Sequence, residues 1–193
     1  MDKTSERLPR RSIAKAGWTF VSEKRARASA FAKGFGGQRS MSAKFKIISA
    51  DHTGITVSNL ERSLAFWRDV LGFEFSHTAH QKGEFAEEIT GVEGAELKLA
   101  VLKTPGGHKI ELLEYLAPAD RKRTNLRPCD VGFVHVALLV KDLDAVLDRI
   151  AASGWKTAGQ PQILTKGPNA GKRVVYVRDP DGTTIELMQS SKR

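Results

Sequence analysis

The chain has 193 residues with 40% hydrophobic and 27% charged side chains, one cysteine and a formal net charge of +9. This composition is that of an ordinary globular protein; one cysteine excludes an internal disulfide framework, and no apolar run approaches the roughly 20 residues of a membrane span. Residues 1–44 hold eleven Lys/Arg and three Asp/Glu, so the rest carries only +1 and lacks the basic footprint of a nucleic-acid-binding domain.

The N-terminal segment, residues 1–46, is rich in Arg, Lys, Ser, Ala and Gly and has no sustained apolar stripe. We therefore predict a basic, disordered extension. Met41 as the true start, a basic arm for polyanions and an organelle transit peptide are the alternatives for this segment. The acidic Asp2 and Glu6 disfavour the transit peptide.

The domain proper is predicted over residues 47–190, and its first module over 47–116. This module begins with a strand at 51–57. Residues 58–61 have the pattern of a capping box, with Ser58 as N-cap, and open a helix that ends at Gly72. One apolar face of this helix is predicted from residues at helical spacing: Leu60, Leu64, Trp67 and Leu71. Strand-like runs follow at residues 73–77, 84–89, 97–102 and 108–115.

A polar connector, residues 117–131, leads to the second module, residues 132–190. The connector contains Arg121, Lys122, Arg123 and Arg127. The second module repeats the order of the first: a strand at 133–140, a helix stopped at Gly154, and extended runs at 162–165, 173–177 and 183–188. The predicted class is therefore α+β, with two tandem βαβββ modules that should pack together and build a shared cavity.

The two modules also share a residue pattern. His52 and His135 are each followed by a small residue two positions later, by valine five later and by leucine eight later. Glu111 and Glu186 each stand between an isoleucine and a leucine, six residues after a proline. Alternation along the strands places both histidines on the face opposite to the helix, where the small residues leave room for a ligand.

A repeated His and Glu at matched positions indicates a shared metal site. A carboxylate flanked by buried apolar neighbours costs several kcal/mol unless a partner compensates it. One divalent cation held by two imidazoles and two carboxylates would satisfy all four groups, and this donor set suits Zn, Ni, Co, Mn or Fe. The predicted metal ligands are His52, Glu111, His135 and Glu186.

The motifs at residues 51–57 and 179–187 resemble those of the vicinal oxygen chelate superfamily. That superfamily includes glyoxalase I, methylmalonyl-CoA epimerase, ring-cleaving dioxygenases, and fosfomycin- and bleomycin-resistance proteins. The resemblance covers residues 48–190 and implies paired βαβββ modules in a curved mixed sheet around a concave metal site. It also implies a homodimer, since in glyoxalase-like members the site often forms between two chains; whether one chain or two build it here is left open.

The resemblance implies a lyase or isomerase of glyoxalase I or acyl-CoA epimerase type, because four ligands are present. A small carbonyl substrate would bind the cation and lose its α-proton to Glu186 or to Glu111. Glyoxalase I usually has an arginine and an asparagine as glutathione anchors where this chain has Thr56 and Tyr115, so another α-hydroxy or α-keto compound or a CoA thioester is favoured.

Two further functions stay open. A metal-dependent ring-cleaving dioxygenase would need only His52, His135 and Glu186. A metal-free protein that binds a small molecule and confers resistance is the other alternative. A lone cysteine, Cys129, fits a reducing compartment, and we expect the protein in the cytoplasm.

Overall fold

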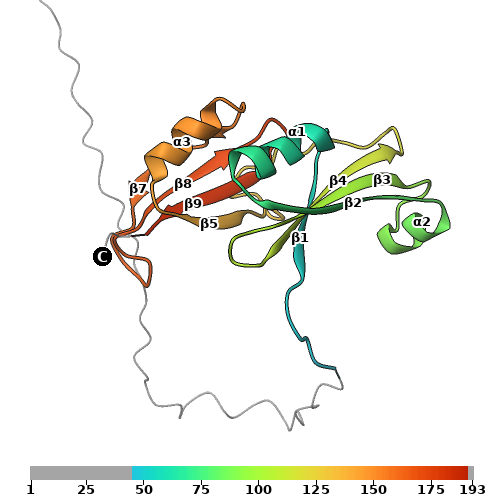
Figure 1. The fold of residues 1–193 in the computed structure, drawn as a ribbon, viewed down its shortest axis with the longest axis horizontal. Coiled ribbons are helices and arrows are strands. Elements are labelled where there is room, and N and C mark those ends of the chain that lie inside the picture. Colours follow the sequence, from blue (N-terminus) through green and yellow to red (C-terminus); the bar gives the residue numbers. More distant parts are fainter. Residues whose placement is uncertain (1–44, 191–193) are drawn as a thin grey trace, which may run out of the picture.

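Residues 45–190 are described by the computed structural model, and they form two mixed sheets (Figure 1). Nearly all of the predicted extension, residues 1–46, lies outside the described residues. The first sheet has the strand order β1 (His52–Thr56), β4 (Lys109–Ala117), β3 (Glu96–Lys103) and β2 (Glu74–Lys82). The second has the order β5 (Val136–Val140), β9 (Thr184–Gln189), β8 (Arg173–Arg178) and β6 (Lys156–Thr157), and β7 (Gln162–Ile163) also pairs with β8.

The strand pairing confirms the α+β class and the repeated order of elements. β1 runs parallel to β4 and β5 parallel to β9, while the other pairs in each sheet are antiparallel. Within residues 45–190, β1 and β5 each pair along one edge only, so no ladder joins the two sheets. The module boundaries drawn from the sequence stay predictions.

The predicted faces of β1 and β5 are confirmed. Ile55 of β1 and Leu138 of β5 pack against the core, whereas Gly54 and Leu139 on the opposite faces are exposed. The expected strand start at residue 133 is wrong: β5 begins at Val136, and Val134 is 74% exposed instead of facing the helix.

The helix after β1 has two parts. α1 (Leu60–Ala65) continues as the π-helical turn η1 (Phe66–Val70), where the Leu71 amide donates to the Phe66 carbonyl at 3.0 Å. The wider turn brings Phe66 into the core beside Trp67, so both aromatic rings are buried, which a regular helical spacing does not predict. Leu60 and Trp67 of the predicted apolar face are buried as expected.

The predicted capping box is wrong by one residue. Asn59 is the N-cap and its side chain accepts a hydrogen bond from the Arg62 amide at 2.8 Å. Ser58 instead donates its amide and its hydroxyl to the two carboxylate oxygens of Asp181, at 2.9 and 2.7 Å. The chain entering α1 is therefore tied to the last turn of the second module.

The strand expected at residues 84–89 is also wrong, because this segment forms α2 (Glu84–Thr90). Its first turn carries two glutamates, which favour a helix N-terminus, and Gly91 adopts a φ of 66° at the C-terminal end. The buried Ala86 packs with Ala95 and Leu97 in a small satellite cluster. The helix propensity of this short run of residues between two glycines thus outweighs the strand propensity of the β-branched Ile89.

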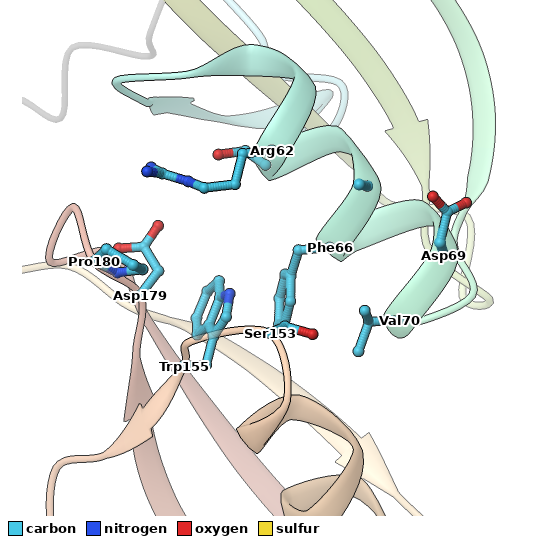
Figure 2. A pocket seen from close by; sticks show the side chains of 10 residues that line it. Arg62, Phe66, Asp69, Val70, Ser153, Trp155, Asp179 and Pro180 are labelled. Atoms are coloured by element: carbon cyan, nitrogen blue, oxygen red, sulfur yellow. The ribbon is translucent and has the colours of Figure 1, made fainter.

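One core joins the two modules through their helical sides. α3 (Leu143–Ala151) contributes Leu143 and Ile150 to it, and Figure 1 shows α1 and α3 on the same side of the sheets. Phe66 stacks on Trp155 with ring centroids 3.9 Å apart and planes 15° apart. Figure 2 shows these two rings facing each other across the junction, beside a cavity of about 270 Å³.

Asp181 is the polar part of this junction. Its side chain is 7% exposed, and Arg62 lies 2.5 Å from one of its oxygens. Burial raises the pKa of Asp181, but the hydrogen bonds from Ser58 and the positive charges of Arg62 and Arg123 outweigh burial and lower the pKa below its usual value. The carboxylate is therefore ionised at neutral pH.

Within residues 45–190, no helix has the length and apolar character needed to cross a membrane.

Candidate functional site

The first His–Glu pair lies on the exposed face of the β1–β4 ladder. Nε2 of His52 is 3.3 Å from Oε2 of Glu111. Gly54 stands opposite Glu111 in the parallel register, and a Cβ at Gly54 would lie 3.9 Å from the same Glu111 oxygen. A small residue at this position therefore keeps side-chain bulk away from the carboxylate.

The second pair repeats this arrangement. Nε2 of His135, one residue before β5, is 3.3 Å from Oε2 of Glu186. Ala137 stands opposite Glu186 in the register of β5 and β9, just as Gly54 stands opposite Glu111. The side chains of the two glutamates are 21% and 19% exposed, so both carboxylates are open to a ligand.

The structure brings the four predicted ligands together as two separate pairs, and not as one group of four. Among the described residues, no group of three or more His, Cys, Asp and Glu side chains could hold a metal ion. A cleft of about 240 Å³ between β1 and the segment before β5 includes His135 in its lining but not His52. Each half of the chain thus presents one imidazole and one carboxylate, which we name half-site one (His52 and Glu111) and half-site two (His135 and Glu186).

Each half-site has neighbours that orient its histidine. Nδ1 of His52 lies 3.0 Å from a carboxylate oxygen of Asp51, whose other oxygen accepts a hydrogen bond from Lys109 at 2.7 Å. Hydrogen bonds from Lys109 and from His52 lower the pKa of the Asp51 carboxyl. A carboxylate on the far ring nitrogen is the arrangement that fixes the tautomer of a ligating histidine.

Tyr176 is the corresponding neighbour of half-site two and is not among the residues predicted from the sequence. Its ring centroid is 4.9 Å from that of His135, and Tyr176 pairs with Glu186 across β8 and β9. Burial and then the negative charge of Glu186 raise the pKa of the Tyr176 hydroxyl. The alternation between Val175 and Val177, both buried, was the only signal that placed Tyr176 on the histidine face.

Two other histidines make contacts outside the half-sites. Nε2 of His108 is 2.9 Å from the Thr53 hydroxyl. His80, within β2, lies 2.8 Å from Glu96 on the surface. Neither histidine is therefore part of a half-site.

Comparisons with known proteins identify the family of the chain. The sequence model of the Glyoxalase/Bleomycin resistance protein/Dioxygenase superfamily matches residues 49–187. A 2-epi-5-epi-valiolone epimerase of Actinomyces sp. is 33% identical over 145 residues, which are 73% of this chain and 79% of the relative. A probable lactoylglutathione lyase of Synechocystis sp. is 31% identical over 146 residues, 74% of this chain and 95% of the relative.

Among solved structures, a glyoxalase family protein from Bacillus cereus is 27% identical, with a TM-score of 0.67 over 78% of this chain and 99% of that one. Both the sequence and the arrangement of strands therefore point to one family. The chain belongs to the Glyoxalase/Bleomycin resistance protein/Dioxygenase superfamily.

Proposed function

We propose that the protein is a divalent-metal-dependent lyase or isomerase that moves a proton at the carbon next to a carbonyl group. The observation that carries this proposal is the repetition of one His–Glu pair, with the same 3.3 Å separation, at matched positions in two sheets. The relatives named epimerase and lactoylglutathione lyase support this class of chemistry.

The spacing of each pair fits two ligands of one ion. Donor atoms bound at about 2.1 Å stand roughly 3.0 Å apart at octahedral angles and roughly 3.4 Å apart at tetrahedral angles. The 3.3 Å distance between Nε2 and Oε2 lies between these values in both half-sites. The four proposed ligands are His52, Glu111, His135 and Glu186, and two nitrogens with two oxygens suit Zn, Ni, Co, Mn or Fe.

A second copy of the chain would complete the set. β1 and β5 have unpaired edges within the described residues, and Leu139 beside half-site two is 67% exposed. An open strand edge next to exposed apolar residues is a surface that proteins normally cover. In a two-fold homodimer, half-site one of each protomer can face half-site two of its partner, which gives two equivalent sets of four ligands.

The residues of the site divide the chemistry between them. When bound, the cation supplies Lewis-acid polarisation of the substrate carbonyl. Glu111 and Glu186 are the candidate bases, since a carboxylate within reach of the α-carbon takes its proton and returns it to another carbon or to the other face. Gly54 and Ala137 leave space beside these carboxylates for the substrate.

The ring-cleaving dioxygenase accounts less well for the geometry. That reaction would use His52, His135 and Glu186 and would give Glu111 no role. Glu111 nevertheless forms the same pair with His52 as Glu186 forms with His135. The repeated geometry therefore favours four ligands over three.

Metal content of the purified protein tests the proposal. Glu111→Gln and His135→Ala should each lower the metal bound per chain, measured by elemental analysis. Glu96→Gln and His80→Ala are matched controls, because these residues form a His–Glu pair at 2.8 Å outside the half-sites. Metal retained in full by both site variants would contradict the assignment.

Proton exchange separates the two enzyme classes. With acetoin, an α-hydroxy ketone, in D₂O, a lyase or isomerase should introduce deuterium at the carbon next to the carbonyl, and Glu111→Gln with Glu186→Gln should abolish this. Oxygen consumption with catechol would identify the dioxygenase instead.

The exposed free thiol of Cys129 fits the reducing cytoplasm that we propose as the location.

A further inference from the structure

The connector between the modules forms one wall of a second cleft, which we name the linker cleft. Its volume is about 510 Å³, and its lining includes Thr56, Tyr115, Arg121, Lys122, Arg123 and Asp181. The connector is held in place by its contact with the last turn of the second module. A Cβ at Gly182, whose φ is 89°, would lie 3.3 Å from the Thr124 carbonyl, so glycine is required for this approach.

The linker cleft carries a surplus of positive charge. Arg121 donates to the backbone carbonyl of Pro118 at 3.3 Å, which leaves its charge uncompensated. Lys122 forms no hydrogen bond or ion pair with any residue in 45–190. Arg123 lies 3.7 Å from an oxygen of Asp181.

Asp181 offsets part of the charge of Arg123, but it is also committed to groups outside the connector. It accepts two hydrogen bonds from Ser58, and Arg62 contacts one of its oxygens at 2.5 Å. A concave surface with three adjacent cations and one carboxylate that is already paired concentrates positive potential.

The linker cleft also lies in line with half-site one. Thr56 follows His52 by four residues on the exposed face of β1, and Tyr115 follows Glu111 by four on β4. Four residues of strand span about 13 Å. The hydroxyls of Thr56 and Tyr115 have no hydrogen-bond partner within the part of the chain that the structure describes, so both are available to a ligand.

We propose that the linker cleft binds a phosphate group on the substrate whose carbonyl end reaches the half-sites. This inference rests on the proposed function and narrows the substrate class to carbonyl compounds that carry a phosphate ester at the far end. Arg121 and Lys122 supply charge-assisted hydrogen bonds to the phosphate oxygens. Thr56 and Tyr115 supply neutral donors at the mouth of the cleft. An anion also relieves the repulsion among the three cations.

Binding of phenyl phosphate to the full-length protein tests this inference without turnover. Calorimetric titration at constant salt should show saturable binding, and Arg121→Ala with Lys122→Ala should weaken it about tenfold. The matched control is Lys82→Ala with Lys141→Ala, which removes the same charge from two exposed positions outside every cleft described above. Thermal unfolding checks that both double variants fold. Benzoate carries the same ring on a carboxylate and should bind more weakly.

The amide resonances of Lys122 and Thr124 should shift on addition of phenyl phosphate. The inference is overturned if no saturation is reached by about 10 mM, if both double variants lose affinity equally, if benzoate binds as tightly, or if the shifts map elsewhere. Glu111→Gln with Glu186→Gln should retain the binding of phenyl phosphate. If the site variants keep their metal while phenyl phosphate still binds to the linker cleft, the proposed reaction is refuted and the phosphate site is retained.

Discussion

Complementation between two inactive chains tests how the ligands assemble. His52→Ala with Glu111→Ala removes half-site one, and His135→Ala with Glu186→Ala removes half-site two. The four side chains are between 19% and 42% exposed and none of them belongs to the core, so each double variant should fold. Neither variant alone can build a set of four ligands from unlike half-sites.

The expected magnitude follows from the symmetry of the proposed homodimer. Equal amounts of the two variants, reassembled at random, give about half mixed dimers, and each mixed dimer has one intact set out of two. The mixture should therefore bind about one quarter of the metal bound by the wild type. Mixed dimers isolated through two different affinity tags should bind about one half.

Elemental analysis of the separate variants, the mixture and the isolated mixed dimers distinguishes the arrangements. Metal near zero in all of them would refute assembly from unlike half-sites of two chains. Roughly half of the wild-type metal in each variant alone would show that like half-sites pair with like. A variant with His80→Ala and Glu96→Ala, which removes the surface His–Glu pair, should keep the wild-type content.

Three further substitutions test individual contacts. Gly54→Val should displace the Glu111 carboxylate and lower metal content in elemental analysis, because even a Cβ would lie 3.9 Å from that oxygen; Gly54→Ala should keep most of the metal, and equal loss in both would contradict this reason. Tyr176→Ala should weaken metal affinity about tenfold in a chelator titration, since the ring that packs against His135 is lost, whereas Tyr176→Phe should bind as the wild type does. Asp181→Asn should lower the free energy of unfolding in urea by about 2 kcal/mol at pH 7. Although burial raises the pKa of Asp181, its hydrogen bonds and charged neighbours lower the pKa overall. This difference should therefore be complete above about pH 4 and should shrink as the pH falls through the lowered pKa; a difference that does not shrink on acidification would refute the ionic origin.

The strand pattern of the chain could be predicted because its cause is local. Alternation along β1 and β5 separates core-facing from exposed side chains, and the parallel register places Glu111 beside Gly54 and Glu186 beside Ala137. A repeat that keeps the histidine, the small residue and the glutamate in step therefore predicts matched positions for these residues in the two modules. These predictions depend only on backbone geometry and on which face is buried.

The errors arise where tertiary contacts override local pattern. Ser58 has the residue type of an N-cap, but Asp181 of the second module takes both of its donors, and Asn59 becomes the cap. The π-helical turn at Phe66 is favoured because it buries a second aromatic ring against Trp155, some ninety residues away in sequence. A spacing rule that considers one helix alone cannot predict a packing partner so far away in the sequence.

The same distinction explains why the sequence does not predict the assembly of the site. A repeat specifies two equivalent half-sites but contains no information on which half-site faces which. Within residues 45–190 the two modules pack through their helical sides, around Phe66 and Trp155, so the histidine faces stay open and the outer strand edges of β1 and β5 have no partner strand among these residues. Because the apolar helix faces are buried in the core of the chain, the faces that carry the histidines and glutamates remain accessible to another molecule. In the proposed homodimer the half-sites of two chains share one ion, so metal binding and dimerisation should depend on each other: dilution below the dimer dissociation constant should release the metal, and added metal should tighten the dimer.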